Sequence, residues 1–213
     1  MNKKILLIGG GGHCKVILDS LLQYEDYDIS IIDKKENIGK SIMGIKIIGS
    51  DDDIARLYSQ GYKYAFISLG SIGNPKIRIK LFDMIDKIGF EIPNIIDKSA
   101  VISRYAKLQK GIFVGKKSVI NSGSIIENGC IINTGAIIEH DCVIKEFVHI
   151  ASGTVLGGNV TINKNTHIGS NSTIRNNLTI GKNTIIGIAS VITKNMEDNK
   201  LAYGNPCKEI KNI

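Results

Sequence analysis

The hydrophobic pattern of the chain changes its period near residue 95. Before that point, short apolar runs alternate with segments whose apolar residues recur at helical spacing. Ser50, followed by three aspartates, predicts the N-cap and acidic first turn of a helix that ends near Gln60. This alternation predicts a small parallel sheet covered by helices. The other expected strands and helices are Lys4–Ile8, Ile29–Ile32 and Tyr64–Leu69, and Cys14–Leu22 and Pro75–Ile88.

From Ile96 onward the period is six. Every sixth residue from Ile96 to Ile192 is aliphatic, which makes 17 consecutive positions without an insertion. Three residues after these positions, Gly or Asn recurs eleven times, and both residues tolerate a positive φ. Short strands joined by one tight corner per hexapeptide predict a parallel β-helix, in which three hexapeptides close one triangular coil. The eleven expected corners are Gly111, Gly123, Gly129, Gly135, Gly153, Asn159, Asn165, Asn171, Asn177, Asn183 and Asn195.

Composition and charge narrow the class of protein. The chain is 43% hydrophobic and 22% charged, as is usual for a soluble globular protein, and no apolar run reaches membrane length. We therefore expect a cytoplasmic protein. The net charge is +7, but the lysines are scattered, Trp is absent and aromatics total 6%, which argues against nucleic-acid binding and favours small phosphorylated ligands.

The cysteines show neither a C-x-x-C pair nor regular metal-ligand spacing. We expect all four to be reduced thiols, with Cys130 and Cys142 as small core residues. The four are Cys14, Cys130, Cys142 and Cys207.

One histidine lies beside a corner of the expected coil. His140 is followed by Asp141, which occupies a corner position where Gly or Asn is usual. One coil to either side of His140 are Ser122 and Gly158, whose small size leaves space beside the imidazole. This register predicts that the His140 side chain is accessible to a substrate rather than buried in the core.

Two further histidines fall on a different part of the coil. His149 and His167 are three hexapeptides apart, which is one full coil, so we expect them to stack on one face. His140 and His149 are separated by half a coil, so they should point away from each other. A site that uses both of them must combine two chains.

The repeat resembles the hexapeptide-repeat acyltransferases, and so does "YGNPCK" (Tyr203–Lys208), although Cys207 stands where Ala is usual there. The segment "NTGAIIEHDCVIKEFVHI" resembles the sialic acid O-acetyltransferase and UDP-4-amino-sugar N-acetyltransferase group. The resemblance implies an N-terminal Rossmann-like α/β domain over residues 1–93 that binds a nucleotide-sugar. It implies a left-handed β-helix with a C-terminal tail over residues 94–213. It also implies acetyl-CoA as co-substrate, no required metal, and a homotrimer with active sites between chains.

The resemblance also assigns roles to residues of the repeat. His140 would be the general base and Asp141 its modulator, with Asn133 lining the sugar site. A neutral imidazole suits proton removal at neutral pH, a carboxylate can fix its tautomer, and backbone N–H groups near glycines can stabilise an oxyanion. The acetyl-CoA site would comprise His149, Gly158, Ser170 and Ile188.

The glycine-rich stretch "GGGGHCK" follows an expected strand and opens an expected helix, where backbone N–H groups can bind phosphate. A dinucleotide fingerprint would need glycine where Cys14 stands, which argues against NAD. In the related sugar acetyltransferases a G-x-x-G-H loop binds the nucleotide-sugar. Carried over to this chain, that site would comprise Gly11, Gly12, His13, Asp33, Lys34 and Gly70.

The leading hypothesis is transfer of an acetyl group to the amino group of a UDP-linked amino sugar, for the synthesis of a surface glycan or glycoprotein. The first alternative is O-acetylation of sialic acid or another surface sugar. A remote alternative is a γ-carbonic-anhydrase-like zinc lyase with His140, His149 and His167 as ligands. A non-catalytic scaffold or binding module is the fourth.

Overall fold

The structure is a computed structural model that describes residues 3–213. The chain forms two compact units. The first runs to Gly70 and resumes over Lys76–Ile95, and the second comprises Ile96–Ile213 together with Ser71–Pro75. We call Ser71–Pro75 the strap, because it packs with the second unit while its neighbours in sequence belong to the first. Within the described residues no helix is long and apolar enough to cross a membrane.

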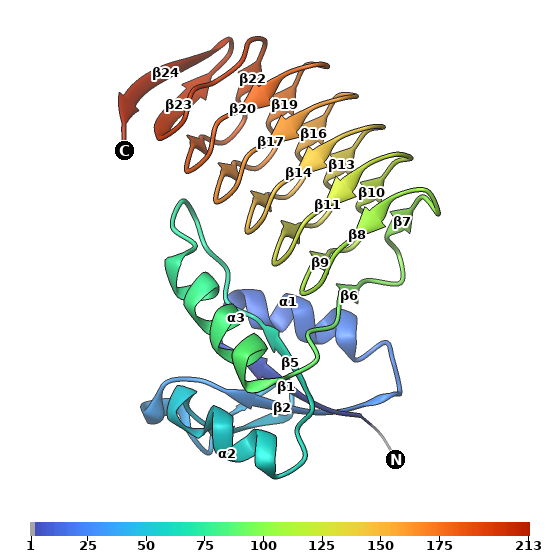
Figure 1. The fold of residues 1–213 in the computed structure, drawn as a ribbon, viewed down its shortest axis with the longest axis vertical. Coiled ribbons are helices and arrows are strands. Elements are labelled where there is room, and N and C mark those ends of the chain that lie inside the picture. The colour runs from blue at the N-terminus through green and yellow to red at the C-terminus, as the bar shows by residue number, and fades with distance from the viewer. Residues whose placement is uncertain (1–2) are drawn as a thin grey trace. The chain divides into compact units, whose positions relative to one another are not determined.

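The first unit is an α/β domain around a five-stranded sheet in the order β3-β4-β2-β1-β5 (Figure 1). The central pairings β1–β2, β1–β5 and β2–β4 are parallel, which confirms the predicted parallel sheet. A hairpin of β3 and β4, turning at Met43 and Gly44 with positive φ, was not predicted from the sequence. The strands are β1 (Lys3–Ile8), β2 (Tyr27–Ile32), β3 (Ser41–Ile42), β4 (Ile45–Gly49) and β5 (Tyr64–Ile67).

The helices of this unit begin and end where the sequence supplies the signals. Ser50 and Asp53 form a capping box, with the Ser50 N–H donating to the Asp53 carboxylate at 2.9 Å. The first turn after this box is a 3₁₀ helix rather than the expected α-helical turn. At the far end of α3, Gly89 has a φ of 100° and stops the helix. The helices are α1 (Gly12–Leu21), η1 (Lys35–Asn37), η2 (Asp51–Asp53), α2 (Ile54–Ser59) and α3 (Lys76–Ile88).

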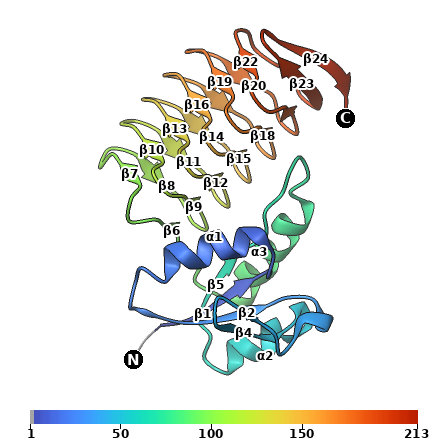
Figure 2. The same cartoon turned by 180° about the vertical axis from the view of Figure 1, so that it is seen from behind.

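The second unit is a left-handed parallel β-helix, seen as a stack of coils in Figures 1 and 2. Each strand pairs in parallel with the strand three hexapeptides further along, as Ile120 does with Ile138, so three hexapeptides close one coil as predicted. The first face holds β7 (Val101–Ile102), β10 (Val119–Ile120), β13 (Ile137–Ile138), β16 (Val155–Leu156), β19 (Thr173–Ile174) and β22 (Val191–Ile192). The second face holds β8 (Lys107–Leu108), β11 (Ile125–Ile126), β14 (Val143–Ile144), β17 (Thr161–Ile162) and β20 (Thr179–Ile180). The third face holds β6 (Ile95–Ile96), β9 (Phe113–Val114), β12 (Ile131–Ile132), β15 (His149–Ile150), β18 (His167–Ile168), β21 (Ile185–Ile186), β23 (Lys200–Gly204) and β24 (Cys207–Asn212).

The corners have the predicted left-handed backbone, with one exception. Ten of the eleven expected Gly and Asn corners have a positive φ, and so do the intervening non-glycine corners such as Asp141 and Phe147. The prediction was wrong for Asn195, because the last coil is shorter than the others and Met196, rather than a residue of the next hexapeptide, bridges to Ile180. The antiparallel pair β23–β24 then closes this end of the third face.

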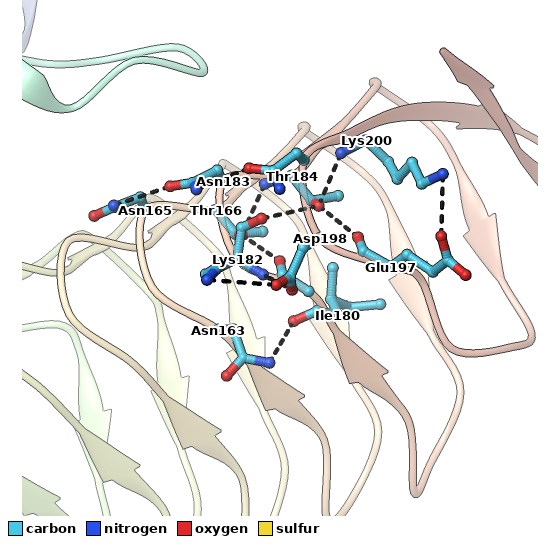
Figure 3. A network of polar contacts seen from close by, with 12 residues as sticks. Asn163, Asn165, Thr166, Ile180, Lys182, Asn183, Thr184, Glu197, Asp198 and Lys200 are labelled. Carbon is cyan, nitrogen blue, oxygen red and sulfur yellow. Dashed lines mark hydrogen bonds and ion pairs between the residues drawn. The ribbon is translucent and has the colours of Figure 1, made fainter. Parts of the chain in front are cut away.

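Inward aliphatic side chains and polar ladders hold the coils together. The ladder positions from Val114 to Ile192 are essentially fully buried, and each such side chain contributes about 1.5–3 kcal/mol. Asn165 and Asn183, both labelled in Figure 3, form a chain of side-chain hydrogen bonds with Asn199 along one corner. The buried thiols of Cys130 and Cys142 donate to backbone carbonyls, which confirms them as small core residues.

Candidate active site

His140 and Asp141 form a hydrogen-bonded pair at the corner between β13 and β14. The imidazole Nδ1 lies 2.9 Å from a carboxylate oxygen of Asp141. Because an ionised carboxylate can only accept, Nδ1 carries the proton and Nε2 presents its lone pair. Asp141 adopts a φ of 60°, which Asp tolerates better than most residues, so an aspartate can occupy this corner in place of Gly or Asn.

Two glycines make room for this pair. A Cβ at Gly158 would lie 2.5 Å from Nε2 of His140, so any side chain there would displace the ring. On the coil below, a Cβ at Gly123 would collide with the carboxylate of Asp141. The side chains of His140 and Asp141 are 56% and 65% exposed, so both remain accessible to a substrate.

The strap covers His149 on the third face. The His149 ring is buried, and its Nδ1 lies 2.9 Å from the backbone oxygen of Ser71. On the other side, Nε2 lies 3.4 Å from the amide nitrogen of Asn133. The structure therefore brings the predicted residues Asn133 and His149 together. Sequence reasoning missed Ser71, because nothing local in "SIGNP" indicates a contact with the β-helix.

His149 and His167 stack as the register predicts. They pair in neighbouring strands, and their rings meet edge to face with centroids 4.8 Å apart. Burial lowers the pKa of His167 to about 4, so its ring is neutral near pH 7. Within residues 3–213, no group of three or more His, Cys, Asp or Glu side chains is placed to hold a metal ion.

The two remaining residues predicted for the acetyl-CoA site lie at successive coils of another corner. Ser170 is partly exposed, and its carbonyl accepts the N–H of Ala189 at 2.8 Å. Ile188, one coil later, is 76% exposed. This corner therefore offers an apolar side chain at the surface.

A pocket of about 400 Å³ lies in the α/β unit at the carboxyl ends of its parallel strands. This is where open α/β sheets bind their ligands. Asp33 and Lys34, both predicted from sequence, line the pocket after β2. Sequence reasoning missed the residues that follow β4, because β4 itself was not recognised. The other lining residues are Ile8, Gly9, Lys35, Ser50, Asp51, Asp52, Leu69, Ile77 and Leu81.

Charges of both signs meet in this pocket. Asp52 pairs with Lys35 at 2.8 Å, and the Asp33 carboxylate accepts a hydrogen bond from Asn37 at 2.7 Å. Burial, assisted by the negative charges of Asp52 and Asp33, raises the pKa of Asp51. Such a pocket suits a ligand that offers both hydroxyl donors and phosphate.

The glycine-rich loop adjoins the same end of the sheet. Gly11 is the N-cap of α1, Gly12 its first residue, and both have open space beside them. His13 follows in α1, and burial together with the charge of Arg78 lowers the pKa of its imidazole to about 4. A Cβ at Gly70 would lie 3.2 Å from the Cβ of His13, so these two predicted residues lie together.

Two family profiles match the chain. The PglD N-terminal domain matches residues 4–85, and the bacterial transferase hexapeptide, of six repeats, matches residues 141–176. The search of curated proteins found no match.

Solved structures match nearly the whole chain. PerB from Caulobacter crescentus, in complex with CoA and GDP-perosamine, is 31% identical with a TM-score of 0.91, covering 98% of this chain and 97% of that one. The acetyltransferase domain of PglB from Neisseria gonorrhoeae, in complex with acetyl coenzyme A, is 30% identical with a TM-score of 0.92, covering 99% and 100%. WeeI from Acinetobacter baumannii, at 24% identity and a TM-score of 0.85, covers 97% and 99% and shares the fold. The chain therefore belongs to the hexapeptide-repeat sugar acetyltransferases.

Proposed function

We propose that this enzyme transfers the acetyl group of acetyl-CoA to the amino group of a nucleotide-linked amino sugar. The observation that carries the proposal is the His140–Asp141 pair, whose Nδ1 to carboxylate distance is 2.9 Å. Its relatives support the acceptor class, since PerB is described with CoA and GDP-perosamine. We propose a cytoplasmic reaction that serves surface glycan or glycoprotein synthesis.

His140 acts as the general base. Attack of the amine on the thioester carbonyl of acetyl-CoA forms the C–N bond, the C–S bond then breaks, and CoA leaves as a thiolate that is protonated to the thiol. To reach the neutral amide, the attacking amine must lose a proton. Nε2 of His140 takes that proton while Nδ1–H remains bonded to Asp141, whose negative charge stabilises the resulting imidazolium. Asp141 stays ionised throughout, because its part is to fix the tautomer and to balance the charge.

Gly158 has two parts in this proposal. The absence of a side chain leaves Nε2 of His140 open, since a Cβ would lie only 2.5 Å away. Its backbone N–H lies on the coil next to His140 and is suited to donate to the oxyanion of the tetrahedral intermediate. Ser170 and Ile188 would then bind acetyl-CoA along the later coils.

The pocket of the α/β unit would hold the nucleotide. Asp33 follows the end of β2, the position at which an acidic residue bonds ribose hydroxyls in related α/β sheets. Lys34 and Lys35 supply positive charge for phosphate, and Ile77 and Leu81 supply apolar walls. We predict UDP as the nucleotide, with the loop from Gly11 to His13 and Gly70 completing the site.

A homotrimer fits the outward surface of the β-helix. The outward residues of the first face are apolar over successive coils, and Val101 is 62% exposed. A row of outward aliphatic side chains marks an interaction surface. The corner that bears His140 begins at this face, so a second copy seated on it would complete the site. The other residues of the row are Val119, Ile137 and Val155.

The test is an acetyl-transfer assay with UDP- and GDP-linked amino sugars and their hydroxyl analogues, read by mass spectrometry. The expected product carries one N-linked acetyl group, and it should form fastest with a UDP-linked amino sugar. His140→Ala should lower kcat at least ~10²-fold while the oligomer persists. O-acetyl product alone would favour the sialic acid alternative, and near-normal activity of His140→Ala would remove the base assignment.

A further inference from the structure

Asp33 directly follows β2, and its two carboxylate oxygens have different surroundings. Oδ2 accepts a hydrogen bond from Nδ2 of Asn37 at 2.7 Å, and a Cβ at Gly10 would lie 2.8 Å from the same oxygen. Oδ1 accepts no hydrogen bond from any group within residues 3–213. One oxygen is therefore held by the protein, and the other remains for a ligand in the pocket that Asp33 lines.

The contact with Asp33 fixes which way the Asn37 amide faces. An ionised carboxylate can only accept, so the atom of Asn37 next to Asp33 must be the donor Nδ2. The amide oxygen is turned the other way, and Nζ of Lys40 donates to it at 2.8 Å. Lys40, Asn37 and Asp33 thus form a line of two hydrogen bonds in which every donor meets an acceptor. The inner bond reaches a charged group, and such bonds are stronger than neutral ones.

Backbone hydrogen bonds hold the segment that carries Asn37. Asn37 lies in η1, and its N–H donates to the carbonyl of Lys34 at 2.9 Å. Shortly after it, the N–H of Gly39 donates to the carbonyl of Ile47, and the N–H of Ile47 donates back to the carbonyl of Lys40, both at 2.9 Å. The segment is therefore tied to β4, which lies next to β2 in the sheet. A backbone held in this way can keep the amide at one angle to the carboxylate.

We propose that Asn37 is a positioning residue, which holds Asp33 so that its Oδ1 meets a ribose hydroxyl of the bound nucleotide. The inference rests on the proposed function, which places the nucleotide in this pocket with Asp33 at the ribose. Ribose hydroxyls are donors, and a carboxylate that is already fixed in direction loses less freedom when it accepts one of them. Asn37 therefore contributes to nucleotide affinity without touching the nucleotide.

Removal of the two ribose hydroxyls isolates this contact. UDP and 2′,3′-dideoxy-UDP share the base and both phosphates and differ only in those hydroxyls. Calorimetry compares their Kd values for the wild type, Asn37→Ala and Asn37→Asp, and the corresponding GDP pair is measured in parallel. Lys40→Met is the matched control, because it removes the outer hydrogen bond and one positive charge from the same segment but keeps the Asn37 donor.

The wild type should bind UDP at least ~10-fold more tightly than the dideoxy analogue, because the analogue cannot donate to the carboxylate. Asn37→Ala should weaken UDP binding about 10-fold and leave the Kd of the analogue within about 3-fold, so that the preference for the hydroxyls nearly disappears. Asn37→Asp should weaken UDP binding further, because two carboxylates would then face each other. Lys40→Met should leave both Kd values within about 3-fold, since its contact is exposed.

A double-mutant cycle with Asp33→Ala separates positioning from a general loss of structure. If Asn37 acts through Asp33, Asn37→Ala should change the Kd of UDP less than ~2-fold in the Asp33→Ala background. The proposal is overturned if Asn37→Ala keeps the wild-type preference for UDP over the dideoxy analogue. It is overturned as well if the effect of Asn37→Ala persists in full when Asp33 is absent.

These measurements need no acetyl transfer. Thermal unfolding checks that each variant is folded, and Asn37→Asp gives a second reading of the contact besides Asn37→Ala. An enzyme that binds UDP or GDP as described but acetylates no amino sugar would refute the proposed function and leave the role of Asn37 intact. A protein that binds neither nucleotide would refute both.

Discussion

Replacing Gly158 by alanine tests the placement of His140, the proposed general base. The new Cβ would lie 2.5 Å from Nε2 and 2.6 Å from Cε1 of His140, whereas ordinary contact begins near 3.4 Å. The imidazole must therefore move by about 1 Å, and a displacement of that size at a reacting group costs ~10²-fold in rate. The fold should tolerate the change, because the His140 side chain is 56% exposed and can swing into solvent.

The assay compares kcat, thermal unfolding and oligomeric state for Gly158→Ala and for Ser122→Ala. Ser122 lies one coil below His140, so its substitution removes a hydroxyl from the same neighbourhood without adding bulk. We expect kcat of Gly158→Ala to fall ~10²-fold, while Tm and assembly match those of the wild type and Ser122→Ala stays within about 3-fold in kcat. Wild-type kcat in Gly158→Ala would refute the reasoning.

Three further predictions follow from single contacts. Asp141→Asn keeps the left-handed corner but removes the negative charge beside the imidazole, so kcat should fall about 10-fold; an unchanged kcat would contradict the role of the pair. Gly10→Ala places a Cβ 2.8 Å from the Asp33 carboxylate, so KM for the nucleotide-sugar should rise about 10-fold with KM for acetyl-CoA constant. The pKa of His167 is about 4 in the folded protein, against an ordinary value of 6.5. Between pH 6.5 and pH 4 the unfolded state therefore binds more protons than the folded state, and the free energy of unfolding falls as the pH is lowered. The loss approaches about 3 kcal/mol below pH 4, and urea unfolding of His167→Leu at several pH values should show a shallower dependence.

Features set by a local period could be predicted from the sequence. The six-residue repeat placed the inward ladder, the left-handed corners and the stack of His149 on His167, because a solenoid makes spatial neighbours of residues at fixed separations. The corner that holds Asp141 followed from the same register. The six-residue period gave a wrong prediction for the backbone of Asn195, because the last coil is shorter and the C-terminal hairpin follows it.

Features set by long-range contacts could not be predicted. The strap belongs to the β-helix through Ser71 and Gly73, yet its residues resemble an ordinary loop, because its partners His149 and Ile185 lie far along the chain. The pocket residues that follow β4 were missed for a different reason. β4 is half of a short hairpin at the sheet edge, and its alternation is too brief to stand out as a strand before Ser50.

Exposure of the proposed catalytic pair links assembly to chemistry. In a single chain His140 and Asp141 are 56% and 65% exposed, and a pair so open to water has a weak mutual interaction of about 0–1 kcal/mol. A general base works better where water is excluded, because the charge it gains is then stabilised by its fixed partner. The face that ends at this corner carries a row of outward aliphatic residues, of which Val101 is the most exposed. A second copy on that face would bury the aliphatic row and exclude water from His140 and Asp141 at the same time. We therefore expect assembly and catalysis to be inseparable in this enzyme.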